Sequence, residues 1–148
     1  MHLAKWVPMD NIYPEAVADE FEWALWYAVW KARKALNLPH TMIANMYRRE
    51  ADDKLLTHKV LIFLAVMITR LGGNDFARHT VVPIMAITVF AGYKLRILQA
   101  HYCLEGLVIR KSHLLSFTDK DVALPNMDIV MRFMAAKMVG NTKNLHVM

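Results

Sequence analysis

The sequence predicts an all-α fold, a single-domain bundle of four to five helices. Three observations favour this prediction. The chain has only five glycines and five prolines in 148 residues, few for many short strands joined by turns. Long segments repeat apolar residues at helical spacing, and capping or charged residues stand where such segments should begin and end. We expect one helical domain over 1–148, with 1–12 as an N-terminal extension and 141–148 as a polar C-terminal tail.

The first helix is expected over 14–36. Pro14 suits the first turn of a helix, acidic residues follow it, basic residues gather near the other end, and Pro39 stops the pattern. One face of this segment is apolar. The opposite face carries four aromatic residues: Trp23, Trp26, Tyr27 and Trp30.

The pattern over 41–71 is helical again, and Gly72 and Gly73 supply a stop. Its polar stretch, 48–54, fits the middle of one helix or a break between two, so both readings stay open. The part from 55 to 71 is apolar on every side, which predicts a helix surrounded by other elements.

Two further helices complete the predicted bundle. Asn74 or Asp75 can cap a helix that continues past Pro83, as a kink, to about Ser116. Gly92 and Gly106 are interpreted as bends within this segment or as points where it divides. Asn126 is expected to cap a last helix that Gly140 closes.

The apolar surplus suggests how the protein works. Its hydrophobic fraction is 56%, against roughly 45 to 50% in typical soluble domains, so we expect association to cover part of it. The sequence thus predicts a non-enzymatic interaction or assembly protein, a homo-oligomer or a subunit of a larger complex. Tryptophan and tyrosine are enriched at interfaces, and methionine adapts to irregular partners. The predicted partner-binding residues are the four aromatics and a stripe on the last helix, Met127, Met131, Met134 and Met138.

A basic protein that binds nucleic acid or another polyanion is one alternative. The formal net charge is +5, and basic residues cluster along the chain. The candidate anion-binding residues are Arg48, Arg49, Arg110 and Lys111.

A metal-dependent helical-bundle enzyme is the other alternative. His101 and Glu105 would stand one helical turn apart, and His58 lies on the apolar segment, so these three are the candidate metal ligands. The Glu-x-x-His motif of bundle metalloproteins is absent, as are phosphate-binding loops and nucleophile elbows. We therefore expect neither catalytic residues nor a cofactor.

The expected location is the cytoplasm or another reducing compartment. Cys103 is the single cysteine of the chain, which excludes an intramolecular disulfide, and the first residues lack the apolar run of a secretory signal. The charge-free segments 60–69 and 79–93 are shorter than a spanning helix requires, so no transmembrane segment is predicted.

Overall fold

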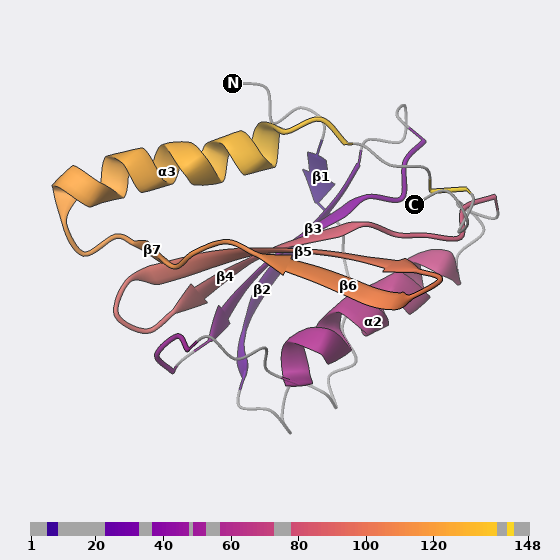
Figure 1. Ribbon diagram of the computed structural model, residues 1–148, viewed down its shortest axis with the longest axis horizontal. Coiled ribbons are helices and arrows are strands. Elements are labelled where there is room, and N and C mark those ends of the chain that lie inside the picture. Colours follow the sequence, from indigo (N-terminus) through magenta and orange to yellow (C-terminus); the bar gives the residue numbers. More distant parts are fainter. Residues whose placement is uncertain are drawn as a thin grey trace.

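In the computed structural model the chain forms a mixed β-sheet with a helix packed on each face (Figure 1). The structure describes residues 6–8, 23–32, 37–47, 49–52, 57–72, 78–138 and 142–143. The predicted all-α, bundle-like helical domain is therefore wrong. None of the helices in these described ranges is both long and apolar enough to cross a membrane.

The sheet runs in the order β1-β2-β3-β4-β5-β6, and β7 extends the β6 edge by pairing with β5. The helix α2 connects β3 to β4, and the helix α3 follows β7. The element bounds are β1 (Trp6–Pro8), β2 (Trp23–Ala32), β3 (Thr41–Tyr47), α2 (Thr57–Leu71), β4 (Ile84–Phe90), β5 (Lys94–Cys103), β6 (Gly106–Lys111), β7 (Leu115–Ser116) and α3 (Lys120–Ala135).

The centre of the sheet is a β-α-β unit. β3 and β4 are parallel, with Cα partners from Thr41 and Ile84 to Tyr47 and Phe90, whereas the other neighbouring strands are antiparallel. Parallel neighbours require a crossover, which α2 supplies. The two parallel strands are buried almost throughout because side chains on both of their faces are covered.

Tight turns join β4, β5 and β6. The first turn contains Gly92 and Tyr93, both with positive φ, and the second contains Gly106, with φ of 117°. Positive φ suits glycine because it has no Cβ. The glycines interpreted as helix bends are therefore parts of hairpin turns.

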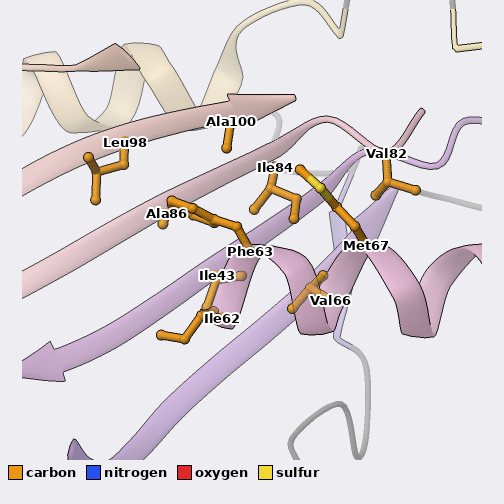
Figure 2. Packing of buried hydrophobic residues seen from close by; sticks show 10 residues of the cluster. All are labelled: Ile43, Ile62, Phe63, Val66, Met67, Val82, Ile84, Ala86, Leu98 and Ala100. Carbon is orange, nitrogen blue, oxygen red and sulfur yellow. The ribbon is translucent and has the colours of Figure 1, made fainter. Parts of the chain in front are cut away.

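One core lies between the sheet and α2. Phe63 is 1% exposed and Val66 is fully buried, and both belong to a hydrophobic cluster with strand residues such as Ile43 and Ala86. Figure 2 shows Phe63 and Met67 reaching from α2 toward the sheet. The helix predicted to end at Leu71 is confirmed, but the prediction that other elements surround it is wrong: it packs on the sheet with one face, and Ile68 is 71% exposed.

A second core lies between the opposite sheet face and α3. Val130 is the buried residue of α3, and Phe133 and Met134 pack beside it against a cluster that includes Met85 and Ile97. Asp119 caps this helix by accepting a hydrogen bond from the Asp121 N–H at 3.0 Å.

The structure corrects the predicted helix boundaries. In the predicted helix over 14–36, the described part of the chain, 23–32, is β2; the rest lies outside the described residues. The segment 41–71 was predicted to be one helix or two; its first part is instead β3, and its last part is α2. The predicted helix ending near Ser116 is replaced by β4 to β7, and α3 begins at Lys120 rather than after Asn126.

Candidate functional site

A cavity of about 270 Å³ lies between the sheet and the end of α3, and we call it the α3-side cavity. It is near the amino ends of the parallel strands β3 and β4. Its wall on the helix side comes from the last turn of α3 and the residues that follow. The lining residues are His40, Thr41, Pro83, Ile84, Met85, Gln99, Ala100, His101, Arg110, Phe133, Ala136, Lys137 and Met138.

Strand register places three lining residues in one row across the sheet. Met85 is the Cα partner of Gln99, and Gln99 is the partner of Arg110. Because partners in neighbouring strands share a face, all three face α3, as the burial of Met85 in the α3-side core confirms. Gln99 and Arg110 are exposed, so an amide and a guanidinium stand beside an apolar floor.

The next row on this face contains two histidines. His101 lies two residues beyond Gln99 on β5, His40 directly precedes β3, and Pro83, which directly precedes β4, lies between them. Two strand spacings separate the backbones of His40 and His101 by roughly 10 Å. His40 is buried and His101 is half-buried, so the imidazoles line the cavity at different depths.

The helix side adds apolar surface and a further cation. Phe133, Ala136 and Met138 contribute the apolar part, and Lys137 is exposed. The Ala136 N–H donates to the Phe133 carbonyl at 3.2 Å, which closes the end of α3 immediately before Lys137.

The electrostatic character of the cavity follows from this lining. Arg110 and Lys137 carry positive charge, His40, His101 and Gln99 can donate hydrogen bonds, and no described lining residue is acidic. The Thr41 hydroxyl donates to the Pro39 carbonyl at 3.1 Å, so this hydroxyl is already engaged within the fold. The arrangement can hold an anion, with an apolar surface beside it.

The predicted aromatic face lies on β2 instead of a helix. The backbone of Trp23, Trp26, Tyr27 and Trp30 belongs to this strand, and Trp30 pairs with Met42 of β3. Their side chains lie outside the described part of the structure. Their role in an interface stays a prediction.

The predicted methionine stripe divides among different environments. Met127 is exposed and Met131 half-buried, Met134 packs against the α3-side core, and Met138 follows α3 and lines the α3-side cavity. Docking through this stripe, and association with a second copy or a larger complex, stay predictions.

The predicted basic residues do not form one patch. Arg110 and Lys111 are consecutive on β6, so their side chains point to opposite faces of the sheet. Arg49 is exposed in the segment after β3, and Arg48 lies outside the described residues. Among the described members of this set, Arg110 alone lines the α3-side cavity.

The candidate metal ligands do not have the helical spacing on which their prediction was based. His101 is on a strand and Glu105 is in the β5–β6 turn, so they are not one helical turn apart. The backbone of His58 belongs to α2, but its side chain is outside the described part. Over the described ranges, no group of three or more histidine, cysteine or acidic residues is placed to hold a metal ion.

Three lining residues, His40, Gln99 and Lys137, were not predicted from the sequence. Each is an isolated polar residue in its segment, and their proximity depends on strand register and on where α3 ends. Strand alternation in β5 would have grouped Gln99 with His101, but only after this segment had been assigned to a strand.

We compared the chain with protein-family models, with curated proteins and with solved structures, and none of the three comparisons found a match.

Proposed function

We propose that the protein binds a small organic anion, an apolar molecule with a carboxylate, in the α3-side cavity. The observation that supports this function is the lining itself. Basic and amide side chains from β5, β6 and the end of α3 converge on a cavity whose remaining lining is mostly apolar. Concave apolar sites with a few convergent polar groups are typical of small-molecule binding.

In this proposal, the carboxylate of the ligand lies near the exposed cations of the cavity lining. Arg110 presents a planar guanidinium, which can donate two parallel hydrogen bonds to one carboxylate. Lys137 approaches from the helix side and adds a second positive charge, and Gln99 adds an amide donor beside Arg110. These three groups recognise the carboxylate in our proposal.

The apolar part of the ligand extends toward the α3-side core. Met85 forms part of the cavity floor, and Phe133 and Met138 contribute the opposite wall. Burial of apolar ligand surface stabilises the complex by about 25 cal/mol for each Å² removed from water, before the cost of association. Both halves of the ligand therefore contribute to its affinity.

The proposal is tested by titrating octanoate and octanol, which share a chain length and differ in charge. Binding is followed by NMR chemical shifts at about 0.15 M ionic strength, where charges more than about 8 Å apart are largely screened. We expect saturable octanoate binding that shifts the amides of 99–101 and 133–138, with octanol at least about tenfold weaker because it lacks the charge.

A matched pair of variants on β6 provides the control. Arg110→Ala should weaken octanoate binding about tenfold, because it removes a charge-assisted hydrogen bond. Lys111→Ala removes the same charge from the opposite face and should leave the affinity within about twofold. Equal losses in both variants, or equal binding of octanoate and octanol, would contradict the proposal.

A further inference from the structure

A second cavity, of about 470 Å³, lies on the other side of β6, and we call it the β6–β7 cavity. Its lining includes Asp52, which follows β3, Arg96 of β5, and the chain from Lys111 to Leu114 between β6 and β7. It therefore lies toward the carboxyl ends of the parallel strands, opposite to the α3-side cavity. In open α/β sheets, ligand sites concentrate outside the carboxyl ends of the strands.

Arg96 is the buried cation of this cavity. The residue is 4% exposed, and its Nη1 atom donates to the Asp52 carbonyl at 2.7 Å. It continues a buried polar row across the sheet, in which Thr88 donates to the side chain of Asn45 at 3.0 Å. A guanidinium held in this way is positioned before a ligand arrives, which lowers the cost of binding.

Lys111 joins Arg96 on the same face of the sheet. Lys111 is the Cα partner of Leu98, which belongs to the α2-side core, and Arg96 is two residues from Leu98 on the same strand. Diagonal neighbours of this kind lie roughly 7 to 8 Å apart. A single small anion can therefore interact with both cations.

Ser112 fixes the chain where it leaves β6. Its hydroxyl accepts a hydrogen bond from the Ile97 N–H at 3.0 Å and donates to the His113 carbonyl at 2.7 Å. The Ser112 N–H also donates to the Ile97 carbonyl at 2.9 Å. These bonds hold Lys111 and His113 on either side of a constrained residue at the cavity wall.

We infer that the β6–β7 cavity binds a phosphate group, supplied by inorganic phosphate or by a small phosphomonoester. Arg96, which the Asp52 carbonyl holds in place, provides a fixed positive charge, Lys111 provides a second charge, and His113 a hydrogen-bond donor. Asp52 adds a carboxylate, which can accept a hydrogen bond from a protonated phosphate oxygen. This site is on the opposite sheet face from the α3-side cavity, so the inference does not depend on the function proposed for the α3-side cavity.

The test is a titration of the full chain with inorganic phosphate and, separately, with methyl phosphate at about 0.15 M ionic strength, followed by NMR. We expect saturable binding that shifts the amides of 96 and 111–114. Preference for inorganic phosphate would assign the site to the free ion, and preference for methyl phosphate to a monoester. Absence of saturation for both would overturn the inference.

The two β6 variants used for octanoate serve again, with the test variant and the control reversed. Lys111→Ala should weaken phosphate binding about tenfold, and Arg110→Ala should leave it within about twofold. Arg96→Lys keeps the charge but removes the guanidinium that the Asp52 carbonyl holds in place, and should weaken binding by a similar factor without unfolding the protein. If Arg96→Lys does not fold, the Lys111→Ala and Arg110→Ala comparison still decides. Equal loss in these two variants would show attraction to overall charge and refute a defined site.

Discussion

His79 and Thr142, which are 63 positions apart in the sequence, meet through side chains, with Nδ1 and Oγ1 2.6 Å apart. Both residues are buried. The Thr142 carbonyl also accepts hydrogen bonds from the N–H groups of Thr80 and Val81, at 2.8 and 3.1 Å. Thr142 belongs to the segment predicted as a polar tail, and it is attached to the chain that leads into β4.

This contact predicts a dependence of stability on pH. Burial, and secondarily the positive charge of Lys143, lower the pKa of His79 below its ordinary value of 6.5. The unfolded chain therefore binds the proton more readily than the folded one. The contribution of neutral His79 to the free energy of unfolding should be complete above pH 6.5. It should decrease as the pH falls from 6.5 toward the pKa of His79 in the folded state.

Urea unfolding at several pH values between roughly 5 and 8 checks this prediction. His79→Asn retains a polar group near the position of Nδ1 but does not titrate, so the part of the pH dependence due to His79 should disappear. Lys143→Gln should reduce that part, since one cause of the lowered pKa is removed. Identical pH profiles for wild type and His79→Asn would contradict the assignment.

The helix α2 could be predicted from the sequence, whereas the sheet could not. The segment ending at Leu71 is long, uninterrupted and followed by Gly72, so its type was clear from the pattern. β4 has the sequence IMAITVF and is buried on both faces, so it lacks the alternation of polar and apolar residues that indicates a strand. Its β-branched residues favour a strand. However, few glycines and prolines mark the turns between the strands, so the turns were not recognised from the sequence.

The candidate site could not be predicted for a related reason. Arg110 was recognised as a possible anion contact, and His101 as a possible ligand, but helical geometry paired His101 with Glu105. In the sheet, alternation places His101 with Gln99, and register places Gln99 beside Arg110. Register depends on long-range pairing, which the local pattern does not contain.

Phe63 should be a major contributor to the stability of the fold. Its side chain is 1% exposed and lies between α2 and the sheet (Figure 2). Phe63→Ala should reduce the free energy of unfolding by about 3–5 kcal/mol, because apolar contacts are lost and a cavity remains. Ile68→Ala is the control on the same helix; since Ile68 is 71% exposed, it should change the stability by no more than about 0.5 kcal/mol. Similar effects of the two substitutions in urea unfolding would argue against this core.

Gly106 should resist replacement because of its backbone conformation. Its φ is 117°, and nothing lies within 4 Å of the position that a Cβ would occupy, so steric contact with neighbours is not the obstacle. Gly106→Ala should destabilise the protein by about 1–3 kcal/mol through backbone strain. Leu104→Ala, at an exposed position of the same turn, should be nearly neutral. Thermal or urea unfolding measures both, and an unchanged stability of Gly106→Ala would exclude this φ.

A substitution at Gln99 tests how much hydrogen bonding, as distinct from charge, contributes to anion binding in the α3-side cavity. It lies between Met85 and Arg110 in one row of the sheet and is exposed, so Gln99→Leu keeps the net charge and most of the side-chain volume. Loss of the amide donor should weaken octanoate binding by about tenfold, because hydrogen bonds to charged groups are stronger than neutral ones.

Octanol binding should be unchanged or tighter in the same variant, since leucine adds apolar surface to the cavity. Phosphate binding to the β6–β7 cavity serves as the internal control, because Gln99 faces the opposite side of the sheet. The decisive quantity is the ratio of octanoate to octanol affinity, which should fall by at least about tenfold. A ratio equal to that of the wild type would mean that Gln99 does not contact the carboxylate, and the anion would then have to be placed nearer to Lys137.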